Sequence, residues 1–168
     1  NVLSLVLFFI VLIPGILVVW PTLFDTMEAF GTTGGLVFLS TYIVASIVYI
    51  VAHELVHGVA YKALTHSKLT FGFTGFVAFC GVPNLYVRRK VALISLLAPF
   101  VVFSVVWPIA CVLIPYIPVK WALFVVWATH ISGCAGDLYD ACLLIFGYRG
   151  QTILMNDTGP KQTIYVKD

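Results

Sequence analysis

The sequence predicts an all-α membrane protein with four transmembrane helices, a short cytoplasmic hairpin or strand segment and a short β-like C-terminal tail. The first observation is composition, because 61% of the 168 residues are hydrophobic and only 10% are charged. Soluble domains carry about 25% charged residues, so a water-soluble core cannot bury this much apolar surface. The second observation is that the apolar residues gather into blocks of about 20 residues, the length that a helix needs to cross a bilayer.

Four apolar blocks define the expected helices. They are Val2 to Trp20, Leu36 to about Tyr61, Val91 to about Ile117, and Trp121 to about Phe146. The first block has no basic flank and no cleavage pattern of small residues after it, so we interpret it as a membrane helix rather than a signal peptide. We expect residues 1–147 to form one transmembrane domain and residues 148–168 to form a cytoplasmic tail.

The charges of the loops set the expected orientation. The first loop carries only acidic side chains, Asp25 and Glu28, whereas the second loop is rich in cations. These cations are Lys62, Lys68, Arg88, Arg89 and Lys90. Loops rich in Lys and Arg stay on the cytoplasmic side of a membrane. With four crossing helices, both termini are then cytoplasmic, and we expect a multi-pass protein of the cell membrane.

Two segments outside the apolar blocks have patterns typical of strands. Leu69 to Cys80 reads LTFGFTGFVAFC, which is too short and too rich in glycine for another crossing helix. Its Phe71 and Phe73 alternate with the period of two that a strand requires. In the tail, Thr152–Met155 and Thr163–Val166 flank a turn-forming Asn-Asp-Thr-Gly sequence. We therefore expect a hairpin or strand in the first segment and two short strands in the tail.

His53, Glu54 and His57 form an HExxH motif near the end of the second block. The spacing places both histidines on one helix face, one turn apart, where both imidazoles can reach one zinc ion. Glu54 cannot comfortably bind the same ion, but it can hold and deprotonate a water molecule. Ionisable groups inside an apolar helix cost a few kcal/mol each, and a bound metal compensates for that cost. The alternative is a structural cluster that is satisfied by hydrogen bonds or lies at the headgroup level.

A catalytic zinc ion takes three protein ligands, so a third must come from another helix. The candidates are Asp137, Asp140 and His130 on the fourth block. At 1.5 Å per residue, the histidine pair lies roughly 6–12 Å from the cytoplasmic end, the two aspartates roughly 10–15 Å and His130 roughly 25 Å. We predict Asp137 as the third ligand and Asp140 as the second choice. We interpret His130 as a hydrogen-bonded interior histidine and His66 as a solvated loop residue.

Together these residues resemble the site-2-protease type of intramembrane zinc metalloprotease. The resemblance rests on HELVHGVAYKAL in the second helix, LISLLAPF at the start of the third and GDLYDACLL in the fourth. The resemblance covers about Ile43 to Gly147. Among such proteins, the chain is most similar to small bacterial membrane proteins described as zincin peptidases. Two runs depart from the better-known proteases. Leu-Ala-Pro ends at Pro99 in place of Ala-Gly-Pro, and Leu138 rather than glycine follows Asp137.

The resemblance implies a membrane-embedded zinc metallopeptidase that hydrolyses peptide bonds near the cytoplasmic face. Glu54 would activate the water and return its proton to the leaving amine. The substrate would be a peptide or a membrane protein, bound as an added strand at Leu69 to Cys80. The alternative interpretation of that segment is an aromatic belt at the interface with the lipid bilayer.

Other classes of function compete with this interpretation. A non-catalytic zinc protein, structural or sensing, would fill all four metal positions, for example with His53, His57, Asp137 and Asp140. A transporter would need ionisable residues along the membrane depth, and here His130 is the sole candidate beyond the cluster. The net charge of +2 excludes the basic binding face that a nucleic-acid partner requires.

Overall fold

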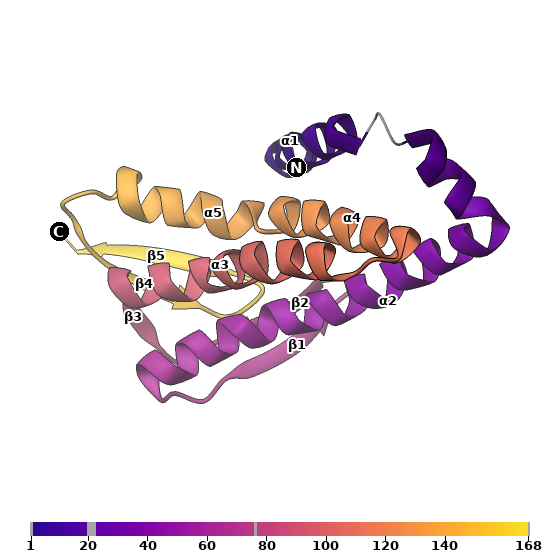
Figure 1. The fold of residues 1–168 in the computed structure, drawn as a ribbon. Helices are drawn as coiled ribbons and strands as arrows, with labels where there is room; N and C mark the ends of the chain where they lie inside the picture. The colour runs from indigo at the N-terminus through magenta and orange to yellow at the C-terminus, as the bar shows by residue number, and fades with distance from the viewer. Residues whose placement is uncertain (1, 20–22, 76, 168) are drawn as a thin grey trace. The chain divides into compact units, whose positions relative to one another are not determined.

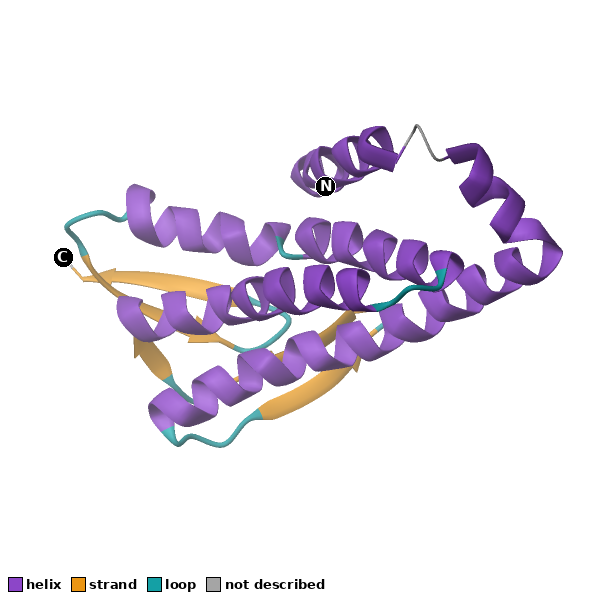
Figure 2. Cartoon of the chain, in the orientation of Figure 1, coloured by secondary structure: helices purple, strands orange, loops and turns teal. Residues whose placement is uncertain are grey.

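The computed structural model describes residues 2–19, 23–75 and 77–167, which are mostly helical with a small β region (Figure 1). The helices are α1 (Val2–Val19), α2 (Leu23–Thr65), α3 (Arg89–Leu113), α4 (Ile117–Gly133), α5 (Ala135–Cys142) and the π-helix η2 (Leu143–Gly147). The strands are β1 (Thr70–Thr74), β2 (Val77–Gly81), β3 (Tyr86–Arg88), β4 (Thr152–Asp157) and β5 (Gln162–Lys167). The strands lie in two stretches of the chain (Figure 2): β1, β2 and β3 come between α2 and α3, and β4 and β5 come after η2.

Helix α2 begins well before the apolar block that predicts it. The segment around Asp25 and Glu28, expected to be a loop, belongs to α2, so that loop prediction was wrong. The helix is kinked at Gly31, where φ is 32° and ψ is −162°. Glycine has no Cβ and therefore adopts a positive φ without steric cost, which lets the helix change direction at this point.

Three helical segments are long and apolar enough to cross a membrane: Phe30–Thr65, Arg89–Leu113 and Ile117–Gly147. The last one combines α4, α5 and η2, with a turn at Cys134 between the first two. The apolar stretch Val2–Leu17 of α1 is helical as expected but shorter. The predicted count of four crossing helices is therefore not confirmed within the described part of the chain.

The chain divides into two compact units. The first unit contains residues 1–48 and 100–135, and the second contains residues 49–99 and 136–168. Within the first unit, α1 packs against α4. Gly15 permits their close approach, because a Cβ at this position would lie only 2.0 Å from Cζ of Phe124. The predicted metal ligands and Glu54 all lie in the second unit.

Strands β1 and β2 form an antiparallel hairpin, which confirms the prediction for Leu69 to Cys80. The hairpin packs directly on α2, just after the HExxH motif. A Cβ on Gly58 would lie 2.8 Å from the ring of Phe71 and 3.2 Å from Sγ of Cys80. The glycine that follows His57 therefore allows the hairpin to lie against the helix that carries the motif.

The second sheet has the antiparallel order β3-β4-β5. The two tail strands are as predicted, whereas β3 was not foreseen. It has three residues and continues directly into α3 at Arg89. The inner side of this sheet packs with α2, α3 and η2 in a buried core. The core residues are Tyr61, Val82, Val87, Ala92, Leu96, Leu144, Ile153 and Met155.

Arg89 links the start of α3 to the end of the last helical segment. Its guanidinium group donates hydrogen bonds to the carbonyl oxygens of Leu144, Tyr148 and Gln151. The final carbonyls of a helix have no partner within the helix, and a cation is favourable there. Arg89 therefore fixes the position of η2, and with it α5, relative to α3.

Asp157 links the tail to α2 and to the end of β2. Its Oδ2 accepts a 2.8 Å hydrogen bond from the Tyr61 hydroxyl, and its Oδ1 accepts one of 2.8 Å from the Gly159 amide. Its carbonyl oxygen accepts a further bond from the amide of Val82. Burial raises the pKa of the Asp157 carboxyl above its ordinary value, although these hydrogen bonds oppose the shift.

Candidate metal centre

His53 and His57 lie on one face of α2, as their spacing predicts. Their Nε2 atoms are 3.2 Å apart, and their ring centroids are 4.9 Å apart. His57 is buried, and the side chain of His53 is 12% exposed. The two imidazoles therefore present adjacent nitrogen atoms to the same small space.

Asp137 approaches the two histidines from α5. Its Oδ2 lies 3.3 Å from Nε2 of His53 and 3.5 Å from Nε2 of His57. α5 begins just after the turn at Cys134, so Asp137 lies in the first turn of a new helix. The three candidate ligand atoms thus form a nearly equilateral triangle.

The other ring nitrogen of each histidine also has a partner. Nδ1 of His57 lies 2.8 Å from the buried carbonyl oxygen of Ser95, which can only accept a hydrogen bond. The proton of a neutral His57 is thereby assigned to Nδ1, which leaves a lone pair on Nε2. Nδ1 of His53 lies 2.9 Å from the Tyr49 hydroxyl. Such partners orient the imidazole ligands of metals and increase their basicity.

The dimensions of the triangle fit a zinc ion. Zinc lies about 2.0–2.2 Å from its nitrogen and oxygen ligands, so two ligands of a tetrahedral site are about 3.3–3.6 Å apart. The edges of the triangle are 3.2, 3.3 and 3.5 Å. Two neutral imidazoles and one carboxylate are also ligand types that zinc prefers, and they leave one of four positions for a water molecule or a substrate.

Glu54 lies beside this triangle, and its carboxylate is half-buried. The backbone amide of Cys80 in β2 donates a hydrogen bond to it. The β1-β2 hairpin therefore holds the one acidic side chain of the motif in place. Nothing in the sequence of β2 could have indicated this contact, because it involves a backbone amide.

Comparison with known proteins identifies the family. A family described as "putative zincin peptidase" matches residues 46–150. The chain belongs to this family. The matched region contains His53, Glu54, His57 and Asp137. At the level of the family, the match supports a metallopeptidase and implies zinc. No curated protein and no solved structure matches the chain.

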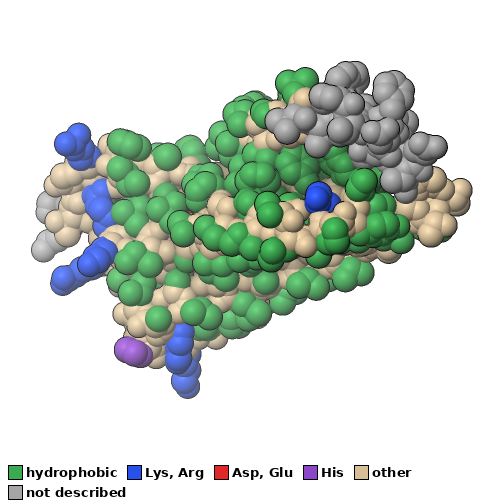
Figure 3. All heavy atoms as spheres, viewed as in Figure 1, with side chains coloured by type: hydrophobic (Ala, Val, Ile, Leu, Met, Phe, Trp, Pro, Cys, Tyr) green, Lys and Arg blue, Asp and Glu red, His purple; other side chains and the backbone are tan. Residues whose placement is uncertain are grey.

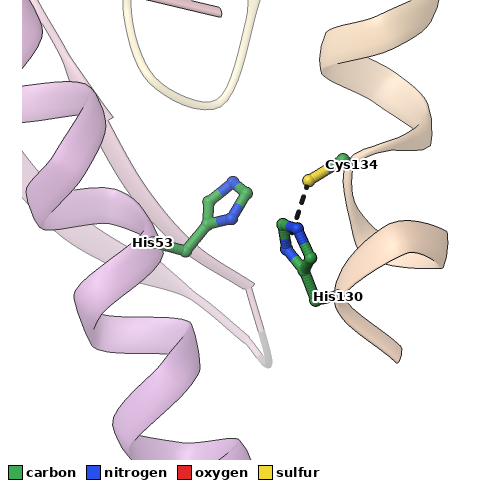
Figure 4. Close-up of side chains that lie close together, drawn as sticks. All are labelled: His53, His130 and Cys134. Atoms are coloured by element: carbon green, nitrogen blue, oxygen red, sulfur yellow. Dashed lines mark hydrogen bonds between the residues drawn. The ribbon is translucent and has the colours of Figure 1, made fainter. Parts of the chain in front are cut away.

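The other residues that the sequence analysis considered in this zincin-family chain lie outside the ligand triangle. Asp140, the second choice for a ligand, is one turn beyond Asp137, and the described ligand triangle does not include it. His66 is exposed and has a φ of 56° at the end of α2. His130 is fully buried in the first unit, where its Nε2 lies 3.4 Å from Oγ of Ser104. Its Nδ1 lies 3.5 Å from Sγ of Cys134, and Figure 4 marks this contact with a dashed line.

The four cysteines are free thiols. Cys80 lies nearest the motif, since its backbone contacts Glu54 and its sulfur lies close to Gly58. Burial raises the pKa of the Cys80 thiol to about 12. At neutral pH it therefore remains protonated and acts as a small apolar group, as we expect for a buried cysteine.

Tyr49 and Ser95 are the functional residues that sequence analysis missed. Tyr49 precedes His53 by one helical turn, so its i, i+4 spacing was a signal that could have identified it. Ser95 contributes its backbone carbonyl, and every residue type has one. The sequence therefore offers no signal for this second contact.

Proposed function

We propose that this protein is a membrane-embedded zinc metallopeptidase of the site-2-protease type that hydrolyses peptide bonds near the cytoplasmic face of the membrane. The observation that carries the proposal is the triangle of His53 Nε2, His57 Nε2 and Asp137 Oδ2, with edges of 3.2, 3.3 and 3.5 Å. The membership of the zincin peptidase family supports it independently.

In this proposal His53, His57 and Asp137 hold the zinc ion, while Ser95 and Tyr49 keep the two imidazole rings in position. The bound ion supplies Lewis-acid chemistry, which polarises a peptide carbonyl and makes water more acidic. Glu54 takes the proton from the attacking water and later delivers it to the leaving amide nitrogen. Its half-buried carboxylate is accessible enough to exchange protons and water.

The membrane assignment rests on composition and on the helices. Three segments have the length and hydropathy of a membrane span, and the motif lies within one of them. The loop between α2 and α3 carries the cations that favour the cytoplasmic side, and His53, His57 and Asp137 lie toward that end of their helices. Peptide hydrolysis on the cytoplasmic side therefore needs no long water channel.

For the substrate we propose an extended segment of a peptide or membrane protein that adds as a strand to the β1-β2 hairpin. The hairpin forms a sheet of two described strands, and Glu54 already engages the backbone of Cys80 in β2, so the outer edge of β1 is the edge to which we expect a further strand to add. The side chains of Phe71 and Phe73 on β1 are 49% and 65% exposed. The contact of Cys80 with Glu54 brings this hairpin next to the proposed base.

The alternative function is that of a non-catalytic zinc protein, in which the metal has a structural or sensing role. A structural zinc site uses four protein ligands. Asp140 was the expected fourth ligand, and it is absent from the described ligand triangle. Three protein ligands with an adjacent glutamate favour catalysis over structural support.

The proposal is tested by the zinc content and the activity of the purified full-length protein. Wild type should contain about one zinc ion per chain, and His53→Ala and Asp137→Ala should lose it. Glu54→Gln should keep the zinc but reduce the hydrolysis of labelled casein by about 10²–10⁴-fold. Equal zinc in all four proteins would refute the metal site. Unchanged hydrolysis by Glu54→Gln would refute the catalytic role.

A further inference from the structure

The outer face of the β3-β4-β5 sheet carries three exposed side chains with large apolar parts. Tyr86, Leu154 and Tyr165 are 55%, 40% and 47% exposed. Arg88 pairs with Leu154, and Leu154 pairs with Tyr165, so these side chains lie together on the side opposite the core. The rings of Tyr86 and Tyr165 pack edge to face, with centroids 5.4 Å apart.

A groove of about 620 Å³ opens between β3, the start of α3 and the two tail strands. Its lining includes Arg88 and Arg89 together with residues of β4 and β5, among them Leu154 and Tyr165. None of the described lining residues is acidic. Figure 3 shows that Lys and Arg side chains gather around this end of α3 and the C-terminal strands. The groove is therefore positively charged and lined with apolar groups.

The sheet is attached to two proposed membrane spans. β3 passes into α3 with no intervening residue, and only Tyr148–Gln151 separate the end of η2 from β4. If α3 and the last helical segment cross the bilayer, as the proposed function requires, the groove lies at the level of the lipid headgroups. Tyrosines with one apolar and one polar end are typical of that level.

We propose that this groove binds the phosphate headgroup of an anionic membrane lipid. Arg89 is engaged with three carbonyl oxygens, so Arg88 supplies the guanidinium group that pairs with the phosphate. Leu154 and Tyr165 contact the glycerol and the first acyl carbons. The bound lipid anchors the sheet to the membrane surface and thereby supports the Asp157 link to the helix of the HExxH motif.

The test measures lipid retention by the full-length protein in an uncharged detergent. Native mass spectrometry compares the retention of dioleoylphosphatidylglycerol with that of dioleoylphosphatidylcholine. Wild type should prefer the anionic lipid, and Arg88→Gln should weaken its binding about fivefold, the effect expected for one interfacial cation. Arg88→Lys should lie between the two. The matched control Lys161→Gln removes one positive charge from an exposed position outside the groove and should behave as wild type.

Equal retention of the two lipids, or equal binding by wild type and Arg88→Gln, would overturn the headgroup site. Displacement of phosphatidylglycerol by millimolar inorganic phosphate would identify a free anion as the ligand and would overturn a lipid ligand. Loss of the protein from the membrane fraction contradicts the proposed function itself. A protein that remains in the membrane and holds zinc, yet shows no lipid preference, contradicts the headgroup site alone.

Discussion

His57 in the second unit and His130 in the first are both buried on apolar helices, but their ring nitrogens have different partners. His57 has a backbone carbonyl at Nδ1, and its Nε2 faces a second imidazole and a carboxylate. His130 has a hydroxyl at one nitrogen and a thiol at the other. Hydroxyls and thiols can each donate or accept, so they satisfy a neutral ring. Burial alone therefore does not distinguish the two histidines, whereas the described partners of their ring nitrogens do.

The largest expected difference between the two histidines is in zinc content. His57→Ala should reduce bound zinc from about one ion per chain to almost none, because two ligands hold zinc poorly. His130→Gln should keep a full complement of zinc. Elemental analysis of both purified variants measures this difference. Zinc loss by His130→Gln with retention by His57→Ala would reverse the comparison.

The second difference concerns how rigidly each unit is packed. A Cβ on Gly81 would lie 2.3 Å from the backbone nitrogen of Gly159, whereas a Cβ on Gly15 would meet the far end of the Phe124 ring. Backbone cannot rotate away, so Gly81→Ala should destabilise the protein by about 3 kcal/mol and Gly15→Ala by less. Thermal unfolding in detergent measures both.

Gly35→Ala is the control for these glycine variants, because nothing lies within 4 Å of a Cβ at that position in α2. It should match or slightly exceed the stability of wild type, since alanine favours a helix. An equal loss of stability in all three variants would show that the close contact of Gly81 has no special role.

The third difference lies in the partners of the imidazoles. Tyr49→Phe removes the hydroxyl beside Nδ1 of His53 and should weaken zinc affinity about tenfold, the lower end of the effect of such partners. Ser104→Ala removes the hydroxyl beside His130 and should leave zinc affinity unchanged. Competition with a fluorescent chelator gives both affinities. Identical affinities in the two variants would contradict an orienting role for Tyr49.

The smallest expected effect is a pH dependence of stability that originates from the Asp157 carboxyl, which is not a metal ligand. The pKa of Asp157 is raised above its ordinary value of 3.8 because burial disfavours the charged form. The folded state therefore binds this proton more tightly than the unfolded state. The contribution of the protonated Asp157 carboxyl to the stability of the folded state is complete below pH 3.8. This contribution is lost as the pH rises through the raised pKa.

Asp157→Asn should remove this part of the pH dependence, so its melting temperature should fall less than that of wild type above pH 4. Melting curves recorded from pH 4 to pH 8 measure the difference. Thr158→Ala, an uncharged change in the same turn, should give a profile parallel to that of wild type. A profile of Asp157→Asn parallel to wild type would contradict the raised pKa.

The sequence predicted the elements whose signals are local. The i, i+4 spacing of His53 and His57 placed them on one face, and the depth estimate placed Asp137 at their level. The alternating phenylalanines predicted the β1-β2 hairpin. In contrast, β3 is too short to have a pattern of its own and depends on pairing with β4, far along the chain. The helical backbone around Asp25 was also missed, because polar residues between apolar blocks are usually in loops.

The position of β4 in its sheet has a consequence for the order of events during synthesis. β4 is the central strand, and the ribosome makes it after every helix of the two units. Tyr61, on the helix with the HExxH motif, therefore receives its Asp157 partner only when the last segment emerges. A nascent chain thus carries the motif for many seconds before this contact can form. The hydrogen bond that ties this helix to the tail is therefore available only after residue 157 has been made.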